Sequence, residues 1–320
     1  MACFVASASP APATKTQPKR QVRTIMIHYR AHDGARRRAY VLLPAWYGPK
    51  DDPPIPLIIS PHGRGVSARA NTKLWRGLPA RGPFAVISPD GEGRRLPRYS
   101  WGSAGQIEDL ARMPVIAHLT LPWLHIDQHR IYAFGGSMGG QETLLLLARH
   151  PRLLAGAAAF DSVTNMALQY RSFPRMPCNR SCHTVWKGSI GRSLQSLARQ
   201  EVGGTPVTRP LAYSERSPVT YVRAIAASCV PLQLWWSVKD RIVANQQHQS
   251  GALFERISKL SANAPVTAFV GSWRHSAEMH AESRLPIALA ALGLLPAETQ
   301  PRVSGLRVFA PSETGGCPRT

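Results

Sequence analysis

Short apolar runs alternate with longer segments of helical periodicity over most of this 320-residue chain. Such an alternation is typical of a sheet whose strands are joined by helices. The first two strands, 22–30 and 38–43, flank a turn at 32–34 and predict an antiparallel hairpin. The remaining runs are unbroken, as strands buried on both faces of a parallel sheet are, and comprise 56–60, 84–88, 130–134, 155–160, 231–236 and 265–270.

Helical patterns occupy the intervals, at 102–119, 138–150, 217–227, 244–260 and 277–293. Together these segments predict one α/β domain over residues 22–295, with a mostly parallel eight-stranded sheet and helices on both faces. Residues 1–21 are expected to be a flexible leader or the remnant of a signal peptide, and residues 296–320 a flexible tail. The connection at 161–214 is too long for an ordinary loop and is expected to form a partly helical cap insertion.

Composition fits a large globular core, because 44% of the residues are hydrophobic. The formal net charge of +21 brings nucleic acid into consideration as a partner. The arginines are scattered, however, with one triple at 36–38, and no interleaved aromatic and basic pattern is present. A solvated basic surface is therefore favoured over a specific nucleic-acid face, and no run of about 18 apolar residues predicts a membrane span.

Five cysteines form no disulfide framework, since their number is odd and their spacing irregular. Cys178 and Cys182 could form a local bridge or, with His183, suggest a metal site, but a structural zinc site needs four ligands. No metal or organic cofactor is therefore predicted. The small residues near the N-terminus slightly favour export over a cytoplasmic location, and the oligomeric state stays open.

The segment Gly135-Gly136-Ser137-Met138-Gly139 matches the pattern Gly-x-Ser-x-Gly. Small flanking residues permit the tight strand-to-helix turn, or nucleophile elbow, that exposes a serine hydroxyl above a sheet. An apolar strand precedes this segment and a long helix follows it, which is the context that the motif requires. Ser137 is therefore the candidate nucleophile.

A serine nucleophile needs a base, and the base needs an acid that orients it; in hydrolases these follow the serine as acid and then histidine. After Ser137 the chain contains two aspartates, Asp161 and Asp240. Asp240 follows the strand 231–236 and is favoured because it lies at the carboxyl end of a strand, the same sheet edge as Ser137. Asp161 ends the preceding strand and is the alternative.

Three histidines lie downstream of Asp240. His275 follows the last predicted strand in a loop at the carboxyl edge, so it is favoured as the general base. His280 is the alternative, although it is expected to lie within the next helix. His248 falls about two turns into the helix after Asp240, which should leave its side chain too distant.

An oxyanion hole requires main-chain N–H groups close to the serine. One donor is expected to be Met138, which directly follows the nucleophile at a helix start. His62-Gly63-Arg64-Gly65 follows the strand 56–60 and lets the main chain approach a substrate, so Gly63 or Arg64 is the candidate second donor.

The order His-Gly-x-Gly, Gly-x-Ser-x-Gly, Asp, His resembles the α/β-hydrolase superfamily over about residues 22–295. Within it, the segments 216–221 and 239–243 resemble the catalytic domain of the prolyl-oligopeptidase-like serine hydrolases. Pro61-His62-Gly63 is similar to secreted esterases related to polyhydroxybutyrate depolymerases and feruloyl esterases. The resemblance implies a Ser-Asp-His triad that works through a covalent acyl-enzyme.

The expected function is hydrolysis of a carboxylic ester, small or polymeric. A peptidase or acylaminopeptidase of the same fold is the alternative, and a basic binding protein without catalysis is a third possibility. The peptidases of the group carry a large β-propeller that is not expected here, and Trp235-Trp236-Ser237 stands where related chains often have glycine. Trp101, Trp235 and Trp236 are the candidate residues for a substrate pocket.

Overall fold

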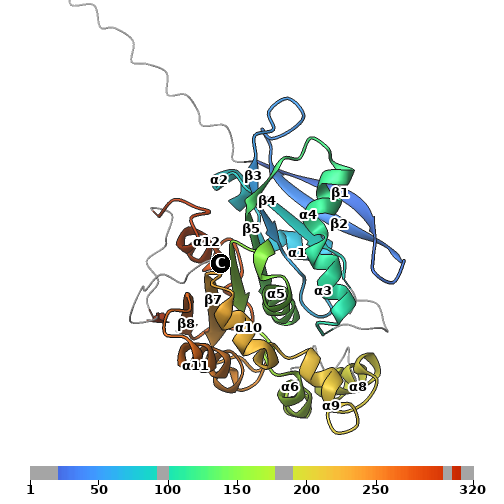
Figure 1. Ribbon diagram of the computed structural model, residues 1–320, viewed down its shortest axis with the longest axis vertical. Coiled ribbons are helices and arrows are strands. Elements are labelled where there is room, and N and C mark those ends of the chain that lie inside the picture. The colour runs from blue at the N-terminus through green and yellow to red at the C-terminus, as the bar shows by residue number, and fades with distance from the viewer. Residues whose placement is uncertain (1–20, 92–100, 177–189, 298–304, 311–320) are drawn as a thin grey trace, which may run out of the picture.

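The computed structural model describes residues 21–91, 101–176, 190–297 and 305–310, and its centre is one nine-stranded sheet (Figure 1). The strand order is β1-β2-β4-β3-β5-β6-β7-β8-β9. From β4 through β8 all neighbours pair in parallel, whereas β1, β2 and β9 pair antiparallel at the two sides. The strands are β1 Val22–Arg30, β2 Arg36–Pro44, β3 Ile55–Ile59, β4 Ala85–Pro89, β5 Ile126–Gly136, β6 Gly156–Phe160, β7 Leu232–Ser237, β8 Val266–Gly271 and β9 Arg307–Phe309.

Helices connect the strands and flank the sheet. The α-helices among the described residues are α1 Ala68–Asn71, α2 Leu78–Arg81, α3 Ala104–Ala111, α4 Met113–Thr120, α5 Met138–Arg149, α6 Met166–Ser172, α8 Ile190–Val202, α9 Pro210–Glu215, α10 Val222–Ala227, α11 Ser250–Leu260 and α12 Leu285–Ala291. Short 3₁₀ helices are η1 Thr72–Leu74, η2 Pro151–Leu153, η3 Phe173–Arg175, η4 Pro218–Tyr221 and η5 Gln246–His248.

The hydrophobic core forms two layers, one on each face of the sheet. In β3, Leu57 and Ile59 belong to one cluster and Ile58 to the other, as side-chain alternation along a strand requires. The first layer includes α5, α10 and α11, and the second includes α12 and α2. The unbroken apolar strands that the sequence shows are therefore buried on both faces, and the predicted α/β-hydrolase fold is confirmed.

Three details of the sequence prediction are wrong. The sheet has nine strands rather than eight, because the exposed strand β9 pairs with β8 inside the segment expected to be a tail. The expected helix at 102–119 divides at Arg112, where α3 ends and α4 begins with a proline in its first turn. The expected helix at 277–293 is an α-helix only over α12.

The long connection between β6 and β7 contains α6, η3, α8 and α9 in its described part. These helices gather beside one end of the molecule (Figure 1) and share a third apolar cluster with Trp101 and Met138. Cys178, Cys182 and His183 lie outside the described residues. Cys229, just before β7, is disulfide-bonded, which is a bond typical of oxidising compartments. No helix in the described residues is long and apolar enough to cross a membrane.

Candidate active site

Ser137 occupies a sharp turn between β5 and α5. Its backbone has φ +59° and ψ −123°, a conformation that a residue with a side chain adopts only under strain. The glycines around it have no room for a side chain, because a Cβ atom on Gly135 would lie 2.2 Å from the carbonyl oxygen of Gly139. A Cβ on Gly139 would lie 2.4 Å from the Pro61 carbonyl oxygen. The sequence motif therefore forms the tight elbow that it predicts.

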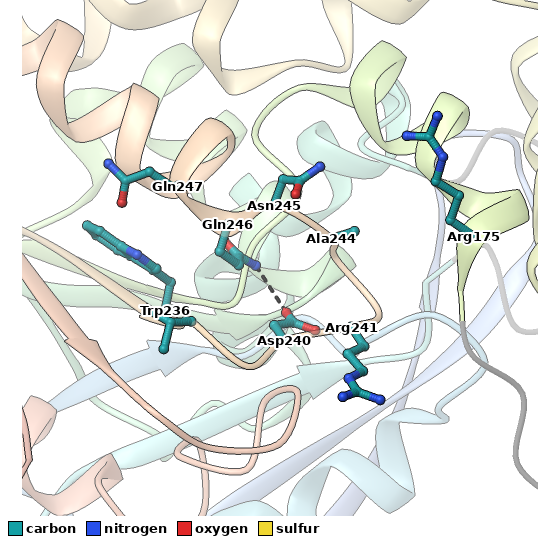
Figure 2. Close-up of a pocket in the computed structure, with 9 residues that line it drawn as sticks. Arg175, Trp236, Asp240, Arg241, Ala244, Asn245, Gln246 and Gln247 are labelled. Atoms are coloured by element: carbon teal, nitrogen blue, oxygen red, sulfur yellow. Dashed lines mark hydrogen bonds between the residues drawn. The ribbon is translucent and has the colours of Figure 1, made fainter.

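Asp240 lies in the loop after β7 and is buried. Its Oδ1 atom accepts hydrogen bonds from the backbone N–H groups of Ile242, at 2.8 Å, and Val243, at 3.2 Å. Its Oδ2 atom accepts one from Gln246 Nε2 at 3.2 Å, which Figure 2 shows as a dashed line, and lies 2.8 Å from Nδ1 of His275. Four donors thus surround this carboxylate and hold it in place.

His275 follows β8, and its side chain is 19% exposed. It lines a cavity of about 290 Å³ together with Ser137, and Gly63, Arg64 and His280 are also in that wall. Burial acts to lower the pKa of His275, but the hydrogen bond to Asp240 and the charges of Asp240 and Asp161 outweigh it and raise that pKa above its ordinary value. An imidazole held by a carboxylate at Nδ1, beside a serine, is arranged to take up a proton through Nε2.

The two other candidate histidines do not contact the acid. His280 is exposed and lines the same cavity, while His248 lies in η5 and is also exposed. Of the three histidines, only His275 forms a hydrogen bond with Asp240 among the described residues. The geometry therefore favours His275 over His280 as the general base, a choice that the sequence left open.

The loop after β3 approaches Ser137 from the other side. A Cβ atom added to Gly63 would lie 3.9 Å from the Ser137 Cβ, so the two residues are close neighbours. The loop turns through a bond from Val66 N–H to the Gly63 carbonyl and a positive φ at Gly65. His62 supports it, since its Nδ1 lies 2.9 Å from the Gly63 carbonyl and its Nε2 accepts the Gly91 N–H. Among the described residues, no hydrogen bond uses the backbone N–H of Gly63 or Met138.

Arg64 connects this loop to the long connection between β6 and β7. Its guanidinium forms an ion pair of 2.5 Å with the completely buried Glu201 of α8 and lies 5.8 Å from the centre of the Trp101 ring. Burial lowers the pKa of Arg64, and the charge of Glu201 opposes that shift. Nothing in the residues around Glu201 marks this ion pair, because pairing across so long a connection leaves no local pattern.

Among the described residues, none of the three candidate pocket tryptophans lines the cavity that holds Ser137. Trp235 is completely buried and stacks on Phe269, with ring centres 3.9 Å apart, so it is a core residue and its expected pocket role is corrected. Trp236 is also buried, and it lines a separate pocket of about 510 Å³ beside Asp240 (Figure 2), whose described lining does not include Ser137. Trp101 is buried beneath Arg64. Trp235 and Trp236 are neighbours in β7 and pack on opposite faces of the sheet, as side-chain alternation along a strand requires.

Asp161, the alternative acid, directly follows β6 and is completely buried. Its carboxylate accepts hydrogen bonds from the backbone N–H groups of Ser237, at 2.7 Å, and Ser276, at 2.8 Å, and from Trp273 Nε1 at 3.1 Å. Burial and the neighbouring Asp240 raise the pKa of Asp161. Glu278 is a further buried acid, which the sequence does not mark because it lies in a segment expected to be a helix.

Ligand atoms of Asp161, Asp240 and His275 lie within 4.8 Å of one another, close enough to be considered as a metal site. Each carboxylate is instead engaged by the N–H donors described above, and His275 Nδ1 lies in hydrogen-bonding distance of Asp240. Hydrogen bonds therefore account for this cluster without a cation.

A comparison with family models matches residues 112–278 to the prolyl oligopeptidase family. Solved structures with the same fold include a hyperthermophilic esterase from the archaeon Pyrobaculum calidifontis, with 16% identity and a TM-score of 0.60 over 85% of this chain and 82% of the esterase. An acylaminoacyl peptidase from Pyrococcus horikoshii has 14% identity and a TM-score of 0.62 over 85% of this chain and 41% of the peptidase.

Dipeptidyl peptidase 4 from Porphyromonas gingivalis shares 17% identity, with a TM-score of 0.58 over 84% of this chain. This chain spans only 34% of that peptidase and 40% of a puromycin hydrolase that also matches. At these identities the solved structures establish the fold that the strand order already indicates.

Proposed function

Because this chain belongs to the prolyl oligopeptidase family of serine hydrolases, we propose that it cleaves carboxylic esters through a covalent acyl-enzyme formed on Ser137. The observation that carries the proposal is the 2.8 Å contact between His275 Nδ1 and Asp240, at a histidine that shares a cavity with Ser137. This arrangement is the one that a serine hydroxyl needs to lose its proton as it attacks.

In the first half of the reaction, the Ser137 hydroxyl oxygen attacks the ester carbonyl carbon while His275 takes the hydroxyl proton at Nε2. Asp240 holds the imidazole in position and stabilises its charged form. The carbonyl oxygen becomes an oxyanion, for which the N–H groups of Met138 and of Gly63 or Arg64 are the proposed donors. When the tetrahedral intermediate collapses, the alcohol departs with the proton from His275 and leaves an acyl group on Ser137.

In the second half, water attacks the acyl carbon and gives a proton to His275. The second tetrahedral intermediate collapses, the carboxylic acid leaves, and His275 returns the proton to Ser137. No redox step and no co-reactant other than water is needed. Every proton therefore moves between the substrate, water, Ser137 and His275.

The charge around the site favours acidic esters as the first substrates to examine. Lys239, Arg241 and Arg274 line a groove of about 1060 Å³ that also reaches His275 and Asp240. The carboxylate of Asp240 is already engaged by its four donors, so these cations give the groove a positive potential. An ester with a carboxylate on its acyl or alcohol part would gain from that potential.

Labelling with a fluorophosphonate probe tests the proposed nucleophile. We expect the native protein to be labelled, and Ser137→Ala and His275→Ala to lose labelling while their thermal unfolding stays close to native. His280→Ala is the matched control, since His280 lines the same cavity without contacting Asp240, and it should still be labelled. Labelling that persists in Ser137→Ala would refute the proposal.

Peptide cleavage is the second candidate, because the family includes peptidases and an acylaminoacyl peptidase shares the fold. This chain matches 82% of the length of the esterase but only 41% of that of the peptidase, which supports an ester rather than a peptide as substrate. Turnover of p-nitrophenyl esters without turnover of N-blocked peptide anilides is the expected result. A higher kcat/KM on the anilides than on the esters would indicate that the protein is a peptidase.

A non-catalytic binding protein is the third possibility, and the +21 charge is the feature that favours it. Binding to nucleic acid that falls steeply with salt and is unchanged in Ser137→Ala, in a protein that no fluorophosphonate labels, would establish that reading instead.

A further inference from the structure

Asp161 joins two loops of the candidate site. It accepts one hydrogen bond from Ser237, the last residue of β7, and two from the His275 loop, through Ser276 N–H and Trp273 Nε1. Ser276 directly follows His275 and has a positive φ of 53°, so its position is set by contacts rather than by backbone preference. Asp161 therefore anchors the segment that carries the imidazole.

Glu278 lies three residues after His275 and is completely buried. Neither of its carboxyl oxygens has a hydrogen-bond partner that meets normal geometry among the described residues. Its carboxyl group is near enough to those of Asp161 and Asp240 for their charges to raise its pKa. Within the described part of the chain, no lysine or arginine forms an ion pair with Glu278 or Asp161.

Two neighbouring carboxyl groups that are both buried do not both ionise, because each negative charge opposes the other and neither is solvated. The donors decide which one is neutral. Asp161 has three N–H donors that stabilise its carboxylate, whereas neither carboxyl oxygen of Glu278 has a donor that meets hydrogen-bond geometry among the described residues. The proton therefore belongs on Glu278, where it can point toward Asp161.

We propose that Glu278 and Asp161 are positioning residues for His275: Glu278 stays protonated beside Asp161, and the Asp161 carboxylate holds the His275 loop and adds a second negative charge behind the imidazole. The inference rests on the proposed function for its catalytic meaning only. Burial and the charge of Asp161 raise the pKa of Glu278 well above its usual range, which agrees with the geometry.

The charged and titratable groups around the pair come from three loops. Asp240 faces it from the loop after β7, and His275 from the loop after β8. Arg284, just before α12, packs its guanidinium 4.6 Å from the centre of the Trp273 ring. Of these groups His275 is the one that titrates near neutral pH, so its own ionisation must be followed separately from that of Glu278.

Thermal unfolding at a series of pH values tests the protonation of Glu278 without any substrate. A buried carboxyl with a raised pKa holds a proton that the unfolded chain releases, so its stability contribution is full at acid pH and is lost as the pH rises. Between pH 5 and pH 8 the native protein should therefore lose stability relative to Glu278→Gln, which keeps a neutral side chain throughout.

Glu282→Gln is the matched control, because Glu282 lies four residues further along the chain, is mostly exposed and pairs with Arg76. Its difference in Tm from the native protein should stay constant over the same range. Glu278→Met provides a second neutral variant if Glu278→Gln does not fold. A constant difference for both Glu278 variants would mean that Glu278 is ionised throughout, and would overturn the proposal.

The imidazole of His275, followed by NMR, tests the charge on Asp161. Asp161→Asn removes a negative charge behind His275 and should lower its pKa by about one unit. Glu278→Gln should leave that pKa within about 0.2 units, since a neutral group replaces a neutral group. An equal fall in both variants would place the charge on Glu278 and refute the assignment.

The pH dependence of kcat/KM adds the catalytic readout. Its acid limb, set by His275, should move to lower pH by about one unit in Asp161→Asn and should not move in Glu278→Gln. If neither the native protein nor any variant hydrolyses an ester, but the Tm and NMR results are as expected, then the proposed function is refuted and the proposed roles of Glu278 and Asp161 are not. If the native protein hydrolyses esters but the acid limb of kcat/KM moves in Glu278→Gln, then only the proposed roles of Glu278 and Asp161 are refuted.

Discussion

The ends of β6 and β7 present the same residue type with different partners. Both strands are parallel neighbours, both are followed by a buried aspartate, and both aspartates lie near His275. Asp161 comes immediately after its strand and accepts N–H groups of the adjoining loops. Asp240 lies three residues beyond its strand and reaches Nδ1 of His275.

Loop length accounts for this difference. A side chain at the very end of a strand stays level with the backbone of the neighbouring strands, where amide groups are its nearest partners. Asp240 lies three residues beyond the end of β7, and its carboxylate is within hydrogen-bonding distance of Nδ1 of His275. Being at the carboxyl edge is therefore not sufficient for an acid to serve a histidine, and the number of residues after the strand matters as well.

Replacing each aspartate by asparagine gives the largest effects and the most direct test of the comparison. In Asp240→Asn we expect kcat to fall by about three to four orders of magnitude, because an amide no longer fixes the histidine tautomer or stabilises its charge. In Asp161→Asn the fall should be about tenfold or less. Steady-state kinetics on an ester gives both values, and a larger loss in Asp161→Asn would reverse the roles of the two residues.

Acid pH should inactivate the enzyme through His275. The base must be neutral to accept a proton, and its pKa is raised, so kcat/KM should decline about tenfold per pH unit below a midpoint above the ordinary histidine value of about 6.5. A pH profile of kcat/KM measures that midpoint. A midpoint below 6 would mean that burial outweighs the two carboxylates, contrary to the geometry.

The sequence predicted the parts of this comparison that depend on local pattern. Unbroken apolar runs identified β3 to β8, and Gly-x-Ser-x-Gly identified the elbow, because both depend on residues next to one another. The order of Asp240 and His275 after Ser137 also followed from strand ends. These features are encoded locally and are visible in one sequence.

Long-range pairing was not visible. Glu201 and Glu278 find their partners only once the chain has folded, and nothing in their neighbouring residues marks them. Trp235 was assigned to a pocket because large aromatic residues are common there, yet its strand position directs it into the core. β9 has exposed side chains, so its pairing through backbone groups left no hydrophobic pattern.

Ser237 connects the loop that carries Asp240 to the loop that carries His275. Replacing it should have an intermediate effect on stability. Its hydroxyl donates to the Trp273 carbonyl at 2.6 Å and accepts the N–H groups of Trp273 and Lys239. Ser237→Ala leaves these buried groups without a partner and should lower the free energy of unfolding by about 2 kcal/mol.

Denaturant unfolding measures that change, with Ser272→Ala as the control. Ser272 is exposed and lies beside the same loop, so its substitution should stay within about 0.5 kcal/mol of native. Equal effects of the two substitutions would show that the link between β7 and the His275 loop adds no stability.

Replacing Gln246 should have the smallest effect on kcat, and it tests which donors hold Asp240 in position. Its Nε2 donates to Asp240 Oδ2, and Ser250 holds its Oε1 at 2.9 Å, so the amide is fixed in one orientation. Gln246→Leu removes one of four donors while the two backbone N–H groups and His275 remain, and we expect kcat to fall about threefold. Gln247→Leu, which changes an exposed neighbour that bonds Glu255, should leave kcat unchanged. A fall of a hundredfold in Gln246→Leu would mean that the side-chain amide, rather than the backbone, holds Asp240 against His275, and loop length alone would no longer explain why this aspartate differs from Asp161.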